Sequence, residues 1–137
     1  MKKLLVFTEN YARGGGNRYM VDVLNALLTE YDEFELLSNE GGVFADDLKR
    51  IDRDIVTSEL NIISTSKICN SVSHYPAFGR RLILIFAFLF EPLLFLLNIA
   101  TTTREIKRIK PTGIISCNGG YPAAQACLSI TLAAKLL

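Results

Sequence analysis

The sequence predicts an α/β fold in which an open parallel sheet carries helices on both faces. Two observations lead to this prediction: a strand, a glycine turn and a helix follow one another near the start of the chain, and the same order returns near its end. Helices that alternate with strands produce parallel sheets, whose ligands collect at the carboxyl ends of the strands. The 137 residues, 50% of them hydrophobic, suffice for a single domain spanning residues 1–137.

The first unit occupies residues 4–28. The apolar run 4–7 indicates a buried strand, three glycines follow at 14–16, and apolar residues then recur at helical spacing. Glycine lets the backbone approach a ligand closely, and the free N–H groups at a helix start favour an anion. The unit therefore predicts a site for a phosphorylated small molecule; a flexible turn without a ligand is the alternative.

The middle of the chain is expected to hold a second strand at residues 34–37, a short helix over about 43–51, and brief extended segments at 54–56 and 60–63. The polar stretch 64–76 is expected to be a loop, because turn-forming residues dominate it.

The last unit begins with a strand at residues 111–117 and continues through Asn118, Gly119 and Gly120 into an alanine-rich helix. Connections of this kind lie at one edge of a parallel sheet, so both glycine turns are expected there. The final helix ends at Leu137 without a capping glycine or proline, which favours a chain that is part of a larger fold.

Composition argues against several kinds of site. Fifteen Lys and Arg against fourteen Asp and Glu leave a net charge of +1, which gives no reason to expect nucleic acid. Cys69, Cys117 and Cys127 lack the spacing of a disulfide framework or a zinc site. The only histidine, His74, has no second ligand type at useful spacing, so no metal is expected. The first apolar run is too short for a signal peptide.

Two standard phosphate motifs do not fit the first glycine turn. The stretch GGGNRYMVD lacks the Gly-Lys-Ser/Thr of a P-loop, and a dinucleotide fingerprint starting at Gly14 would require a glycine where Tyr19 stands. A nucleotide-dependent oxidoreductase domain therefore rests on the fold alone. We expect no binding of a nicotinamide dinucleotide, and a titration would test this.

A hydrophobic helix is expected at about residues 80–109. Residues 82–90 are all apolar, Glu91-Pro92 interrupts them, and basic residues flank the segment on both sides. A helix without a polar face must be buried in protein or lipid, and its basic flanks suit anionic headgroups. A kinked helix in the membrane surface is favoured, with a core helix and a membrane span as alternatives. A membrane span would put the first and last strands on opposite sides of the bilayer, whereas the predicted sheet requires them to lie side by side.

Two stretches resemble a known family. YARGGGNRYMVDVLNALL, residues 11–28, is similar to the glycine loop and first helix of the amino-terminal domain of GT-B glycosyltransferases of the family 4 type. IKRIKPTGIISCNGGYPAAQACLSITLAAKLL, residues 106–137, is similar to that family's stretch in which a basic helix end and a proline lead into a strand, a polar turn and a helix. The resemblance covers both ends of the chain but not residues 40–80.

The resemblance implies a Rossmann-like, incomplete GT-B amino-terminal domain, which is the acceptor-side half of a retaining enzyme. Such an enzyme transfers a sugar from a nucleotide-sugar donor to a saccharide or lipid-linked saccharide acceptor, without a metal cofactor. The surface helix suits a lipid-linked acceptor in polysaccharide biosynthesis and a location peripheral to the cytoplasmic face of the membrane. Because the family's two donor-binding glutamates lie in a carboxyl-terminal domain, this chain alone is expected to be inactive. A non-catalytic, membrane-associated binding subunit with a separate catalytic partner is the alternative.

The resemblance also implies where the donor diphosphate binds. It assigns main-chain contacts to Gly15 and Gly16, with Asn17 and Arg18 beside them at the helix start. Arg18 has a second reading as a solvated surface residue, which is common for an arginine at a helix start.

A contact to the acceptor or sugar is implied at Asn118, Gly119 and Gly120. Many relatives carry a histidine at the position of Asn118. Asparagine can hold a hydroxyl group but cannot exchange a proton near neutral pH, so the resemblance does not extend to acid–base catalysis at this position. A structural Asn-Gly turn is the alternative.

Overall fold

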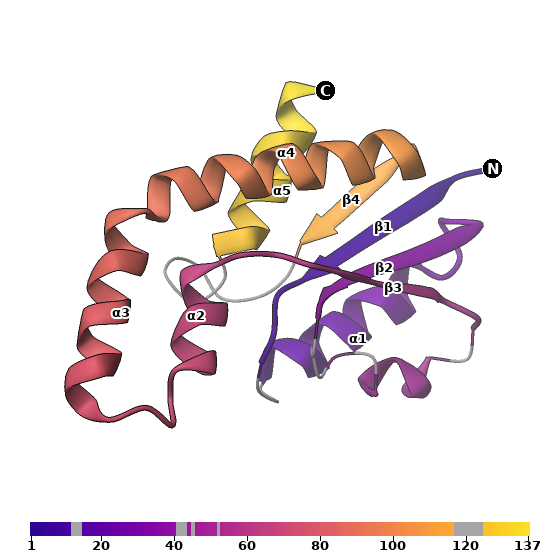
Figure 1. Ribbon diagram of the computed structural model, residues 1–137. Coiled ribbons are helices and arrows are strands. Elements are labelled where there is room, and N and C mark those ends of the chain that lie inside the picture. The colour runs from indigo at the N-terminus through magenta and orange to yellow at the C-terminus, as the bar shows by residue number, and fades with distance from the viewer. Residues whose placement is uncertain (12–14, 41–43, 45, 52, 117–124) are drawn as a thin grey trace.

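Four parallel strands form one sheet in the order β3-β2-β1-β4 (Figure 1). They are β1 (Lys3–Thr8), β2 (Glu33–Asn39), β3 (Val56–Leu60) and β4 (Gly113–Ser116). The computed structural model describes residues 1–11, 15–40, 44, 46–51, 53–116 and 125–137. The parallel sheet and its helices confirm the α/β, Rossmann-like fold class predicted from the sequence.

The central strand β1 joins the two predicted units. Leu5 of β1 pairs with Glu35 of β2 on one side and with Ile114 of β4 on the other. Because these strands are parallel, the carboxyl ends of β1 and β4 lie next to each other at one edge of the sheet. We call this side of the sheet, where the strands end, the carboxyl edge; it is distinct from the outer strands of the sheet. The two strand-to-helix connections predicted to carry ligand sites therefore start from neighbouring positions.

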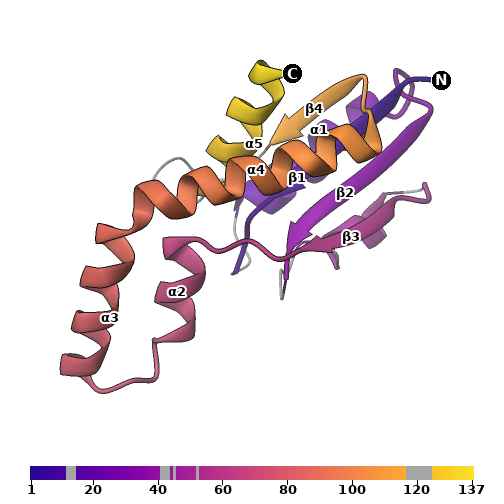
Figure 2. The same cartoon turned by 45° about the horizontal axis from the view of Figure 1, so that its top comes forward.

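Helices cover both faces of the sheet (Figure 2). One face carries α1 (Gly15–Leu27) and the 3₁₀ helix η1 (Asp47–Arg50), and the other carries α4 (Glu91–Ile109) and α5 (Gln125–Leu136). Leu4 and Val6 of β1 pack in the core beneath α1. Leu5 and Phe7 pack in the core beneath α4 and α5. Burial on both faces explains why β1 is a continuous apolar run rather than an alternating one.

A helix occupies part of the stretch 64–76, which was expected to be a loop. α2 (Thr65–Ser71) begins after Ser64, whose side chain accepts a hydrogen bond from the main-chain N–H of Lys67 at 3.0 Å. The loop prediction is wrong for this segment. Serine, threonine and asparagine favour helix N-caps as well as turns, so composition alone did not distinguish the two.

The strand β3 also differs from its prediction. The two extended segments expected at 54–56 and 60–63 are replaced by one strand, which pairs with β2 from Val56 to Leu60. Only Leu60 of this edge strand is buried, so the sequence carries no apolar run that would mark its limits. Within the described residues, the helix expected over about 43–51 is represented by the short η1 alone.

The hydrophobic segment at residues 80–109 forms two helices. α3 (Ala77–Leu89) and α4 are bent by 62° relative to each other, and Pro92 lies in the first turn of α4. This confirms the predicted kink, because proline lacks an N–H and its ring clashes with the preceding turn of a helix. α3 projects away from the sheet beside α2, whereas α4 runs across the sheet (Figures 1 and 2).

The two helices have different surroundings. Phe78, Ile85 and Leu89 of α3 are 77%, 62% and 68% exposed, whereas Thr102 and Ile106 of α4 are buried. The core-helix alternative therefore describes the second half of α4 and not α3. Among the described helices, none is by itself long and apolar enough to cross a membrane, although α3 and α4 taken together have the necessary length and composition.

Asn98 fastens α4 to the chain between β3 and α2. Its Nδ2 donates to the main-chain oxygen of Ile63 at 2.9 Å, and its Oδ1 accepts from the main-chain N–H of Ile63 at 3.3 Å. The asparagine is only 3% exposed. One side chain thus pairs both polar main-chain groups of Ile63 and connects α4 to this segment.

Candidate functional site

Glu9 is a buried carboxylate at the carboxyl edge. It follows β1 directly and is 1% exposed. Its Oε2 accepts a hydrogen bond from the main-chain N–H of Ala126 at 3.0 Å, and its Oε1 accepts one from the hydroxyl of Ser64. The N-terminal turn of a helix favours negative charge. A single carboxylate therefore links β1 to the starts of both α2 and α5.

Tyr11 lies next to this carboxylate. Its hydroxyl donates to Oε1 of Glu9 at 3.4 Å. Burial, followed by the negative charge of Glu9, raises the pKa of Tyr11 to about 12. The phenol therefore stays protonated over the whole physiological pH range and can act as a hydrogen-bond donor at this edge.

The residues predicted to bind the donor diphosphate start α1. Gly15 and Gly16 form its first turn, where main-chain N–H groups have no partner within the helix. The side chain of Asn17 is buried and already engaged: its Oδ1 accepts from Nδ2 of Asn10, and its Nδ2 donates to Oδ2 of Asp47 at 2.9 Å. Main-chain N–H groups and the exposed side chain of Arg18 are therefore the groups that this turn offers to a ligand.

The predicted acceptor contacts Asn118, Gly119 and Gly120 lie outside the described residues. Their connection starts at the end of β4, beside the end of β1. Among the described residues, no group of three or more His, Cys, Asp or Glu side chains could hold a metal ion.

Sequence analysis did not identify the polar residues whose hydrogen bonds connect the strands and helices at this edge. Besides Glu9, Asn10 donates its main-chain N–H to Oδ1 of Asn39 at 2.5 Å, which joins the ends of β1 and β2. The available signal was the position of these residues, since Asn10 follows the apolar run of β1 and Asn39 ends that of β2. Polar groups at that position of parallel strands meet at one edge.

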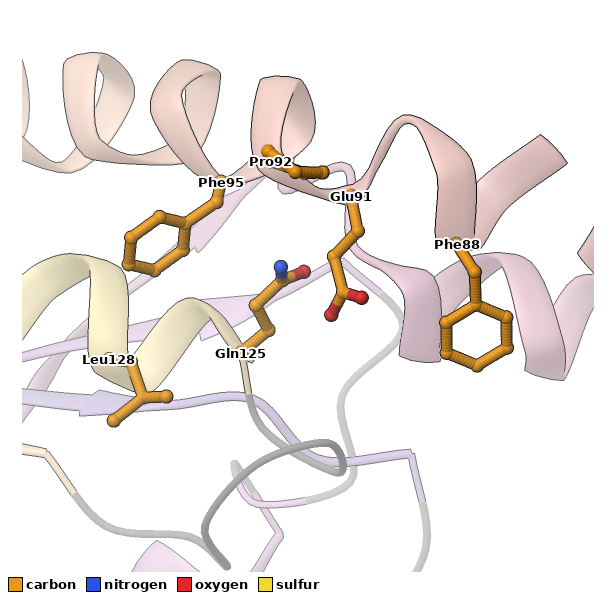
Figure 3. Close-up of a pocket in the computed structure, with 6 residues that line it drawn as sticks. All are labelled: Phe88, Glu91, Pro92, Phe95, Gln125 and Leu128. Atoms are coloured by element: carbon orange, nitrogen blue, oxygen red, sulfur yellow. The ribbon is translucent and has the colours of Figure 1, made fainter. Parts of the chain in front are cut away.

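Described residues line two cavities at the carboxyl edge, and Phe88 belongs to both of them. The smaller has a volume of about 380 Å³ and is lined by Phe88, Glu91, Pro92, Phe95, Gln125 and Leu128 (Figure 3). The larger has a volume of about 510 Å³ and is lined by Tyr11, Thr65, Ser66, Cys69, Asn70, Ser73 and Phe88. Each contains a buried oxygen without a hydrogen-bond partner, Oε1 of Gln125 in the first and Oγ1 of Thr65 in the second.

The fold is similar to that of a known enzyme. No protein-family model and no curated protein matches the sequence. Among solved structures, the crystal structure of MurG from Acinetobacter baumannii superposes on 99% of this chain with a TM-score of 0.60 and 18% sequence identity. The chain spans only 32% of the length of that MurG chain. It thus has a glycosyltransferase-like, Rossmann-type α/β fold that matches part of a GT-B structure.

Proposed function

We propose that this chain is the acceptor-side half of a GT-B glycosyltransferase of the family 4 type, which transfers a sugar with retention of configuration. The observation that carries the GT-B part of the proposal is the similarity of almost the whole chain to part of MurG, a GT-B glycosyltransferase. The family 4 type and the retention of configuration rest on the resemblance of residues 11–28 and 106–137. The donor would be a nucleotide sugar, and the acceptor a saccharide or a lipid-linked saccharide.

The donor diphosphate would bind at the start of α1. Gly15 and Gly16 would offer main-chain N–H groups there, with the exposed Arg18 beside them. The start of α5 at the same edge is less suited to an anion, because the carboxylate of Glu9 already accepts from the main-chain N–H of Ala126. This difference supports α1, rather than α5, as the site of the diphosphate.

Catalysis would need a second nucleotide-binding domain. The two donor-binding glutamates of the family belong to a carboxyl-terminal domain, so this chain by itself is expected to be inactive. Its partner domain can reside in the same polypeptide or in a separate subunit. A non-catalytic, membrane-associated binding subunit remains the second candidate, and the exposed apolar surface of α3 is the observation that favours it.

We place the protein at the inner surface of the membrane through α3. Ile85, Phe86 and Leu89 expose 62%, 57% and 68% of their surface, and Arg80 and Arg81 are exposed next to them. Apolar side chains flanked by cations suit an anionic lipid surface. β1 and β4 pair in one sheet, so the segment between them leaves that sheet and returns to it, which supports binding to one side of the membrane.

The test of transfer uses the endogenous protein, isolated with an antibody against this chain. Intact mass and identification of co-purifying chains show whether a second nucleotide-binding domain accompanies it. The assembly is then incubated with radiolabelled UDP-, GDP- and dTDP-sugars and a membrane lipid extract. We expect one labelled product, which Gly16→Val abolishes and the exposed strand variant Glu59→Gln does not. An assembly without a second domain and without transfer would leave only the binding-subunit alternative.

The test of membrane binding is co-sedimentation with vesicles. We expect the chain to bind vesicles that contain phosphatidylglycerol, more weakly at high salt, and to lose binding in Ile85→Glu combined with Leu89→Glu. Leu136→Glu is the matched control, because Leu136 is 69% exposed but lies on α5. Equal binding by these two proteins would contradict the assignment to α3.

A further inference from the structure

The smaller cavity lies between the first turns of two helices. Glu91 and Pro92 begin α4, Gln125 begins α5, and all three line the cavity. Figure 3 shows the side chains of Gln125 and Glu91 directed toward each other, with Phe95 and Leu128 to one side and Phe88 to the other. The site is therefore an apolar space in whose wall two polar side chains face each other.

Gln125 is the unusual member of this wall. The residue is 3% exposed, and its Oε1 has no hydrogen-bond partner. A buried polar atom without a partner typically costs about 1–3 kcal/mol, and most such atoms in proteins are satisfied by protein or water. An amide oxygen only accepts hydrogen bonds, so a ligand that satisfies it must bring a donor.

The rest of the lining limits the ligand further. Phe88, Phe95 and Leu128 offer apolar surface, and a carboxylate from Glu91 stands on the wall opposite the amide. An anion such as phosphate would lie close to the Glu91 carboxylate, which repels it, whereas a neutral hydroxyl group can donate to the amide oxygen. Phe88 and Leu128 are also 49% and 43% exposed, so apolar surface continues from the cavity to the outside.

We propose that this cavity binds a long-chain alcohol, whose hydroxyl donates to Oε1 of Gln125 and whose chain lies against Phe88, Phe95 and Leu128. A volume of about 380 Å³ falls within the usual range of small-molecule sites. The site is separate from the proposed diphosphate site at α1, and it does not depend on sugar transfer. Water in the cavity is the competing occupant, because it too can donate to the amide.

The test exploits the absence of tryptophan from the sequence. Phe95→Trp places one indole in the cavity wall, Phe88→Trp places one on the opposite side, and Phe78→Trp places one at the exposed start of α3 as a control. Each protein is titrated with monomeric 1-octanol and with 1-methoxyoctane, which has a similar chain but no donor, while indole emission is recorded. Using two reporters keeps the test valid if one variant fails to fold.

We expect 1-octanol to shift the emission of both cavity reporters saturably and to leave the Phe78→Trp control without a saturable shift. The ether should bind about three- to tenfold more weakly, as one lost hydrogen bond predicts. Gln125→Met, which keeps the length of the side chain, should reduce the affinity for octanol to that for the ether. The proposal is overturned if neither reporter responds, if the ether binds as tightly, or if Gln125→Met leaves the difference unchanged.

Discussion

Replacing Glu9 by glutamine tests how the carboxyl edge is held together. Glu9→Gln keeps the shape of the side chain and removes its charge. In the native protein the carboxylate accepts from the main-chain N–H of Ala126 at 3.0 Å and from the hydroxyl of Ser64. Glutamine has one acceptor oxygen and one NH₂ group, so it cannot accept at both positions in the same way.

The expected loss in the free energy of unfolding of Glu9→Gln has two parts. A hydrogen bond to a charged group contributes about 1.5–3 kcal/mol, and a negative charge at a helix N-terminus adds about 0.3–1 kcal/mol. The free energy of unfolding should therefore fall by about 2–4 kcal/mol. Domains are typically stable by about 5–15 kcal/mol, so the variant should still fold.

Urea unfolding followed by circular dichroism measures this loss. With a slope of about 2 kcal/mol per molar urea, the midpoint should fall by about 1–2 M. Glu59→Gln is the matched control on an exposed strand position and should stay within about 0.5 kcal/mol of the native protein. The pKa of Tyr11 should fall from about 12 but stay above its usual 10, because burial remains when the charge is gone. Equal midpoints for the two variants would refute the proposed role of Glu9.

Three further predictions concern packing and local backbone structure, and urea midpoints test all three. Asn98→Leu should lower the free energy of unfolding by about 1–3 kcal/mol, because it removes two hydrogen bonds to the main chain between β3 and α2. Asn25→Leu on the exposed face of α1 should be nearly neutral, and similar losses in the two variants would contradict this role of Asn98. Gly79→Ala should stabilise α3 by about 0.5–1 kcal/mol, since a Cβ there meets nothing within 4 Å. Gly113→Ala should lower the free energy of unfolding by about 1–3 kcal/mol, because its Cβ would lie 2.5 Å from the hydroxyl oxygen of Tyr31. Adding Tyr31→Leu should recover this loss, and a double variant without recovery would rule out the clash.

Where strands and helices are buried, local pattern predicted them well. The run at residues 4–7 and the helical spacing after the first glycines correspond to β1 and α1, and Glu91-Pro92 marks the break between α3 and α4. Prediction failed at β3 and α2. β3 is an exposed edge strand without an apolar pattern, and α2 is a short polar helix whose Ser64 cap has the composition of a turn.

For the candidate site, too, the sequence predicted local features but not the contacts between distant residues. Sequence placed a glycine turn at the start of α1, but it could not show that the side chain of Asn17 is engaged with Asn10 and Asp47, nor that Gln125 lines a cavity with the start of α4. These contacts join residues far apart in the chain. They depend on where the elements pack, and a periodic pattern carries no information about that.

The sequence alone therefore determined the class of fold, the position of the first strand and first helix, and the break between α3 and α4, because hydrophobic periodicity and the backbone restrictions of proline are local properties. Only the tertiary structure decided that Glu9 links three elements, that α3 is exposed while the end of α4 is buried, and that a buried amide faces an apolar cavity. Burial and hydrogen bonding between distant residues come from packing, which brings those residues together only in the folded chain.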